Sequence, residues 1–228
     1  MSAESSRSSS PDEPLQHQSG IQSALDYTED QALAELQRAD ISTAEIAKLA
    51  KSPAVAKSRK LALAVVLHPR APRHISIPLL RRLFVFDLMQ VSLTPAVAAD
   101  IKRAAEDQLI VRSESLSKGE KISLAKRASG RIAAVLLQED EERVISPALD
   151  NPRLTEALVV QALMKQKAPK PLFILASGHR KWMNAREVQI ALLRSEKTPL
   201  ERAKKIAKNF PEEFLRTIVP QERSDSLQ

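Results

Sequence analysis

The sequence predicts an all-α fold, and three observations support this prediction. Only four of the 228 residues are glycine, while Ala, Leu, Ile, Lys, Arg and Glu are abundant and lose little rotamer freedom in a helix. Helix-start signals, in which Ser or Thr precedes Glu or Gln by three residues, recur along the chain. Similar segments also recur at regular spacings, which is typical of stacked helical repeats.

Three segments share one pattern of helix-ending residues: AVVLHPRAP at 64–72, PALDNPRLT at 147–155 and ALLRSEKTP at 191–199. His68, Asn151 and Ser195 occupy the same position in them, 83 and 44 residues apart. These spacings approximate two periods and one period of about 42 residues, the size of a two-helix unit. We therefore expect a short α-solenoid of about four degenerate two-helix repeats. The three aligned residues are expected to form hydrogen bonds at helix ends.

A second pair of segments supports the same period. SPAVAKSRKLALAVVL from Ser52 and TPAVAADIKRAAEDQL from Thr94 align without gaps at an offset of 42 residues. Both place proline at the first helical position, where its missing N–H costs nothing. We expect a helix to begin directly after Ser52 and after Thr94.

Capping residues and apolar spacing locate the other helices. Capping boxes at Thr28 and Ser42 predict helices over 29–38 and 43–51. Further helices are expected within 68–91, over 120–138, near 142–150, after Thr155, after Pro171, from Ala185, and after a capping box at Thr198.

Both ends of the chain differ in composition from the region between them. Residues 1–24 are rich in Ser, Gln, Pro and acidic side chains, so we expect a disordered tail. We expect the solenoid over 25–219 and a polar tail over 220–228. Because both tails are net negative, the +7 charge of the chain becomes about +10 on 25–219, which would attract phosphates, anionic lipid or acidic proteins.

Several kinds of chemistry are excluded by composition and spacing. The chain has no cysteine, which excludes disulfides, Cys-ligated zinc and iron–sulfur clusters. Its four histidines lack zinc-binding spacing, no glycine-rich phosphate loop is present, and the acidic run at 139–142 lacks an EF-hand pattern. We expect no cofactor, metal site, catalytic residue or small-molecule substrate. No targeting signal or membrane-spanning run is visible, so we expect a cytoplasmic protein.

The HP-x-x-P and NP-x-x-T patterns at His68 and Asn151, with V-x-x-ALL at 188–193, resemble HEAT-like α-solenoids near the leucine-rich-repeat-variant proteins of bacteria. GEKISLAKRASG at 119–130 and ALDNPRLTE at 148–156 also resemble segments of uncharacterised bacterial proteins. The resemblance covers most of residues 47–219. It implies macromolecular binding along a curved surface and carries over no catalytic residue. Some leucine-rich-repeat-variant proteins hold an iron–sulfur cluster on cysteines, which this chain lacks.

Two basic clusters form the candidate interaction surface: Lys121, Arg127 and Arg131 in one, and Arg180, Lys181 and Trp182 in the other. Arg127 and Arg131 are four residues apart, which places them on one helix face. That face either contacts anions or is simply solvated. Trp182 either stacks on a nucleobase or peptide between its basic neighbours, or packs in the core.

These observations predict a non-enzymatic interaction module that binds a protein partner on one face of the solenoid. The alternative is a nucleic-acid-binding solenoid whose Lys and Arg residues contact phosphates along a basic face. A DNA glycosylase is a third hypothesis, but that activity needs an aromatic-lined pocket and the chain has one Trp and one Tyr. The sequence leaves the partner and the oligomeric state open.

Overall fold

A computed structural model describes residues 27–219 of the chain. Within this range the structure contains fifteen α-helices, one short 3-10 helix and no strand, which confirms the all-α prediction. The tails expected at 1–24 and 220–228 lie outside the described residues.

The helices are short and follow one another closely. In chain order they are α1 Glu29–Leu36, α2 Thr43–Ala50, α3 Pro53–Lys57, α4 Arg59–Leu67, α5 Arg73–Leu80, α6 Val85–Leu93, α7 Ala99–Ser113, α8 Lys118–Arg127, α9 Gly130–Leu136, α10 Glu142–Leu149, α11 Glu156–Leu163, α12 Lys170–Ala176, η1 Trp182–Asn184, α13 Arg186–Arg194, α14 Leu200–Ala207 and α15 Glu212–Ile218.

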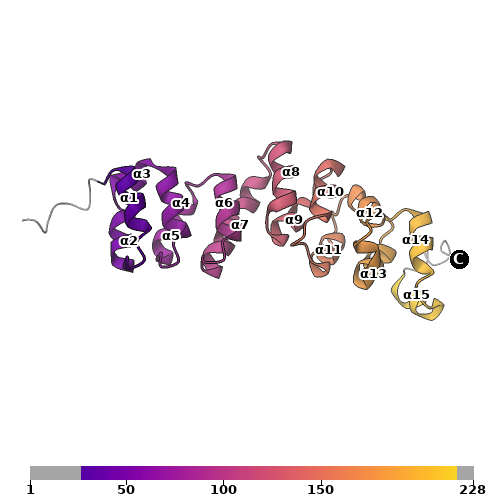
Figure 1. The fold of residues 1–228 in the computed structure, drawn as a ribbon. Helices are drawn as coiled ribbons and strands as arrows, with labels where there is room; N and C mark the ends of the chain where they lie inside the picture. Colours follow the sequence, from indigo (N-terminus) through magenta and orange to yellow (C-terminus); the bar gives the residue numbers. More distant parts are fainter. Residues whose placement is uncertain (1–26, 220–228) are drawn as a thin grey trace, which may run out of the picture.

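The helices form an extended double row that runs from α1 at one end to α15 at the other (Figure 1). In this view α6, α8, α10, α12 and α14 lie along the upper row, with α7, α9, α11, α13 and α15 below. Helices pack on neighbours in the stack, as in the contacts of α8 with α10, α10 with α12, and α11 with α13. This arrangement is compatible with the predicted α-solenoid, in which each unit buries its apolar face against the next.

Four predicted helix starts are confirmed. Thr28 and Ser42 form complete capping boxes before α1 and α2, because each hydroxyl accepts an N–H and the third helical residue bonds back. Ser52 caps α3, with proline in the first helical turn, and Thr155 caps α11 by accepting the N–H of Leu158.

The predicted period of about 42 residues is wrong, and so is the count of four units. Two helices fill a unit of 42 residues only if both are long, and most helices of this structure are short. The first helices of successive pairs, α4, α6, α8, α10, α12 and α14, begin at residues 59, 85, 118, 142, 170 and 200. Units are therefore 24 to 33 residues long. His68 and Asn151 follow the first helices of their pairs, three units apart, whereas Ser195 follows the second helix of its pair.

Other helix predictions fail where a turn interrupts an apolar pattern. The helices expected within 68–91 and over 120–138 are each two helices, because turns separate α5 from α6 and α8 from α9. Thr94 ends α6, and α7 begins only at Ala99. The N-cap residue of α14 is Pro199 and not Thr198, whose hydroxyl donates to the carbonyl oxygen of Leu192 at 2.7 Å.

The turn before α9 also has a packing reason. A Cβ atom added at Gly130 would lie 2.1 Å from the carbonyl oxygen of Arg153, closer than any real contact. Glycine therefore allows the turn between α10 and α11 to approach the first residue of α9. Ser129 precedes it and accepts the N–H of Ile132, which starts the helix.

Candidate interaction surface

Four turns along the stack share one local hydrogen bond. In each turn a side chain accepts the backbone N–H of the residue two positions later. The pairs are His68 Nδ1 with Arg70 at 3.1 Å, Asn151 Oδ1 with Arg153 at 2.8 Å, His179 Nδ1 with Lys181 at 3.2 Å, and Ser195 Oγ with Lys197 at 3.3 Å. The helix-end role expected for three of these residues is confirmed, and His179 is a fourth member that the sequence comparison missed.

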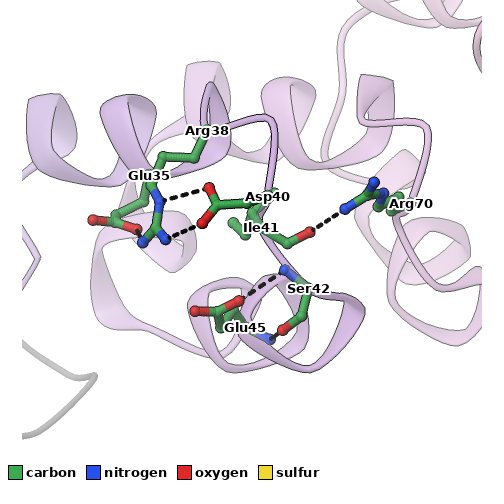
Figure 2. A network of polar contacts seen from close by, with 7 residues as sticks. All are labelled: Glu35, Arg38, Asp40, Ile41, Ser42, Glu45 and Arg70. Atoms are coloured by element: carbon green, nitrogen blue, oxygen red, sulfur yellow. Dashed lines mark hydrogen bonds and ion pairs between the residues drawn. The ribbon is translucent and has the colours of Figure 1, made fainter.

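The Arg or Lys whose N–H is bonded in each turn also donates a side-chain hydrogen bond to a main-chain carbonyl of the preceding unit. Arg70 donates to the Ile41 carbonyl at 3.0 Å, as Figure 2 shows beside the ion pairs of Arg38 and the capping box of α2. Equivalent bonds join Arg153 to Arg127 at 3.3 Å, Lys181 to Leu154 at 3.1 Å, and Lys197 to Ala168 at 2.6 Å. The acceptors lie 26 to 29 residues earlier, at helix ends or in the following loops, where carbonyls lack helical partners.

Three further arginines bond carbonyls of a neighbouring unit. Arg112 donates to Leu83 at 2.6 Å and to Arg81 at 3.0 Å, and Arg202 donates to Ser177 at 3.0 Å. Arg82 donates to Val55 at 3.2 Å and also to Ala56. We call the seven side chains of this kind the seam cations: Arg70, Arg82, Arg112, Arg153, Lys181, Lys197 and Arg202. Part of the positive charge of the chain thus holds its units together.

Beside α10, two neutral side chains also donate hydrogen bonds to main-chain carbonyls at the seam, the contact between neighbouring units. Asn151 is 1% exposed, and its Nδ2 donates to the carbonyls of Ala125 at 2.7 Å and Ala128 at 3.1 Å. Trp182 is 2% exposed, and its indole N–H donates to the Leu149 carbonyl at 2.9 Å. A buried indole offers no face to a nucleobase, so the stacking hypothesis for Trp182 is wrong and the core-packing alternative holds.

The other predicted surface residues divide into paired and unpaired cations. The Nζ of Lys121 lies 2.9 Å from both carboxylate oxygens of Glu139. Arg131 pairs with Asp107 at 2.6 Å and Glu106 at 3.4 Å, and the hydrogen bond to Asp107 raises the pKa of Arg131. Lys181 is bound to Leu154 as a seam cation, with its Nζ 4.1 Å from the centroid of the Trp182 ring.

Arg127 and Arg180 are exposed, and each belongs to a different surface feature. The Arg127 guanidinium carbon lies 5.9 Å from the centroid of the Phe86 ring. Arg180 lines a groove between the end of α12 and α14. The residues predicted from sequence therefore do not form one basic stripe.

Two phenylalanines at the start of α6 are unusually exposed. Phe84 is 63% exposed and Phe86 is 41% exposed, and they are two of the five exposed large hydrophobic residues in the described range. The Arg59 guanidinium carbon lies 4.3 Å from the centroid of the Phe84 ring, the distance of a cation–π contact. We call Arg59, Phe84, Phe86 and Arg127 the aromatic patch.

Two contacts of Asp87 fix the start of α6, where both rings lie. The backbone N–H of Phe84 donates to the Asp87 carboxylate at 3.0 Å, which fixes Phe84 as the residue before the helix. Asp87 also lies 3.4 Å from an Arg59 guanidinium nitrogen. The sequence run RRLFVF at 81–86 places two phenylalanines shortly after two arginines. The single helix predicted within 68–91 gave no reason to expect that these phenylalanines are exposed.

Between residues 27 and 219 no group of three or more His, Asp or Glu side chains could hold a metal ion. None of the helices described combines the length and apolar character needed to cross a bilayer. Comparisons with family models, with curated proteins and with solved structures find no match to this chain.

Proposed function

We propose that the chain is a non-enzymatic interaction module that binds an acidic protein segment through the aromatic patch. The observation that supports this proposal is the exposure of Phe84 and Phe86 beside the guanidinium groups of Arg59 and Arg127. Aromatic residues and arginine are enriched in protein interfaces, where a few of them supply most of the binding energy. Single exposed hydrophobic residues are common, but two phenylalanines beside two arginines combine those preferred residue types.

The charge around the patch favours an acidic partner. Arg82 bonds the carbonyls of Val55 and Ala56, which brings the turn before α6 against the end of α3. The exposed cations Lys57 and Arg81 lie in these two segments, and neither forms an ion pair with a described residue. A partner segment with carboxylates flanking an apolar side chain would complement both the rings and the cations.

A protein partner fits the patch better than nucleic acid does. Each phenylalanine already has a guanidinium near its ring face, the face on which a base would stack. Lys121 and Arg131, which a basic face was expected to use, are paired with carboxylates.

Peptide selection tests this proposal. The full chain is used to select binders from a phage-displayed library of random peptides, and fluorescence anisotropy measures the affinity of the enriched peptides. We expect acidic peptides with an apolar residue to be enriched. The double variant F84A/F86A should bind them at least about tenfold more weakly, because both rings are truncated. The control variant V111A/M164A removes two other exposed apolar side chains and should bind normally.

Three results would overturn the proposal. One is the absence of enriched acidic peptides, and another is equal binding to wild type and F84A/F86A. The third is saturable binding of labelled DNA or RNA that falls steeply with salt and is lost in R59Q/R127Q, which would establish the nucleic-acid alternative.

A further inference from the structure

An open groove of about 710 Å³ lies near the C-terminal end of the stack. Its lining residues come from the turn after α12, from η1 and from α14 with the turn after it: Ser177, Gly178, Arg180, Met183, Asn184, Glu201, Arg202, Lys205 and Asn209. We call it the C-terminal groove. Its volume lies in the range of ligand pockets, and its walls carry many polar groups.

The charge of the C-terminal groove is positive and only partly compensated. Arg180, Arg202 and Lys205 supply three cations, against the single carboxylate of Glu201 among the lining residues. No ion pair with another described residue involves any of these three cations. Their charges are therefore available to an anionic ligand, unlike those of Lys121 and Arg131.

Arg202 is held in place at the wall of the groove. One of its terminal nitrogens, Nη1, donates to the Ser177 carbonyl at 3.0 Å, which leaves its other N–H groups for a ligand. Gly178 provides the space for this guanidinium, because a Cβ atom there would lie only 2.4 Å from Nη1. The main chain thus orients Arg202 before any ligand arrives, which lowers the entropy cost of binding.

We propose that the C-terminal groove binds a phosphate monoester. The lining cations and carboxylate leave a net charge of +2, which matches a group of about −1.5 to −2 at neutral pH. Two amides, Asn184 and Asn209, add donors to those of the three cations. Donors from three segments suit the tetrahedral phosphate group, which accepts bonds from several directions, better than a planar carboxylate.

The site is separate from the aromatic patch. Every lining residue lies between 177 and 209, whereas the residues of the patch lie between 59 and 127. Variants of the groove therefore leave the proposed protein interface intact, and each proposal can fail without the other.

Isothermal titration calorimetry of the full chain tests the proposal with inorganic phosphate, phosphoserine and a phosphoserine peptide at constant ionic strength. We expect saturable binding of the phosphate group. R180Q/K205Q should bind at least about tenfold more weakly, because two charge-assisted contacts are lost. The matched control K126Q/R143Q removes two exposed cations outside the groove and should bind as wild type does.

G178A separates geometry from charge. The new methyl group occupies the space of the Arg202 guanidinium and keeps every charge of the protein, so weaker phosphate binding would support a built site. A phosphoserine peptide that binds more tightly than inorganic phosphate would identify a phosphorylated protein as the source. Equal affinity would identify a small phosphate compound.

Three outcomes overturn the proposal. The first is the absence of saturable phosphate binding, and the second is an equal loss in R180Q/K205Q and K126Q/R143Q, which would indicate only the general positive field. The third is binding of a dinucleotide phosphodiester as tight as that of phosphoserine, because a monoester site must favour the dianion.

Discussion

The seams of the stack near its N-terminal end differ chemically from the seam beside α10. Between α1 and α7, Arg70, Arg82 and Arg112 bond the free carbonyls, and their guanidinium groups are partly exposed. Beside α10 the cations Arg153 and Lys181 are joined by two buried neutral donors, Asn151 and Trp182. The backbone requirement is the same in both regions, since each must satisfy carbonyls that have no helical partner.

The difference between these seams is access to water. A carbonyl that loses a partly exposed arginine can bond water instead, so the free energy of unfolding falls only modestly. A carbonyl that loses Asn151 stays buried and unpaired, and the full cost of removing it from water remains. The two regions should therefore respond differently to loss of their donors.

The largest effect is expected from N151A. This change removes both donors to Ala125 and Ala128 and should lower the free energy of unfolding by about 3 kcal/mol. N151D should be comparably destabilising, because a carboxylate keeps the acceptor for Arg153 but cannot donate. Urea unfolding followed by circular dichroism measures both values.

The matched control for that measurement is N209A, since Asn209 is exposed and its side chain bonds no carbonyl among the described residues of another unit. N209A should change the free energy of unfolding by less than about 0.5 kcal/mol. If N151A were no more destabilising than N209A, the contrast between the two kinds of seam would be wrong.

A smaller effect is expected from R112M. Methionine keeps an apolar stem but cannot donate to Leu83 or Arg81, so the free energy of unfolding should fall by about 1 kcal/mol. The same urea titration measures this value. A loss as large as that of N151A would show that partly exposed arginines stabilise the stack as strongly as buried amides do.

The smallest effect concerns pH. Burial, together with the nearby charge of Arg70, lowers the pKa of His68 below its ordinary value of 6.5. The fold thus favours neutral histidine, whose Nδ1 accepts the N–H of Arg70. This stabilisation is present above the unfolded-state pKa and is lost as pH falls below about 6.5.

H68N should remove this pH dependence, because asparagine keeps an acceptor, as Asn151 does in the equivalent turn, and does not titrate in this range. Urea midpoints of wild type and H68N, compared between pH 7.5 and 5.5, measure the difference. We expect the midpoint to fall further with acid in the wild type, by less than the change caused by R112M. Parallel profiles would exclude His68 as the titrating group.

Short-range features of the fold could be predicted from the sequence, and long-range ones could not. Thr28, Ser42 and Thr155 start helices through bonds to residues three positions away, so the pattern is visible in the sequence. The turns before α6 and α9 interrupt runs whose apolar spacing continues, and the expected helices were therefore too long. The true unit length was not predicted, because the sequence alignment matched His68 with Ser195. His68 follows the first helix of its pair, whereas Ser195 follows the second helix of its pair.

At the candidate sites, too, the residue types could be predicted from the sequence but their long-range contacts could not. The basic residues were visible, but a carbonyl acceptor 26 to 29 residues away has no residue-type signature. Only the spacing of His, Asn or Ser two residues before Arg or Lys marks four of the seam cations: Arg70, Arg153, Lys181 and Lys197. Arg180 was predicted, but Arg202 and Lys205 join it only through the packing of α14 against the turn after α12.

The short reach of the seam cations has a consequence for how the chain folds. Each bond closes a loop of about thirty residues at most, so ordering one unit needs no contact with the distant end of the chain. Such low contact order favours rapid folding that can begin at any unit and propagate to its neighbours. Under mechanical tension the molecule should accordingly lengthen in a series of small steps, each releasing one helix pair.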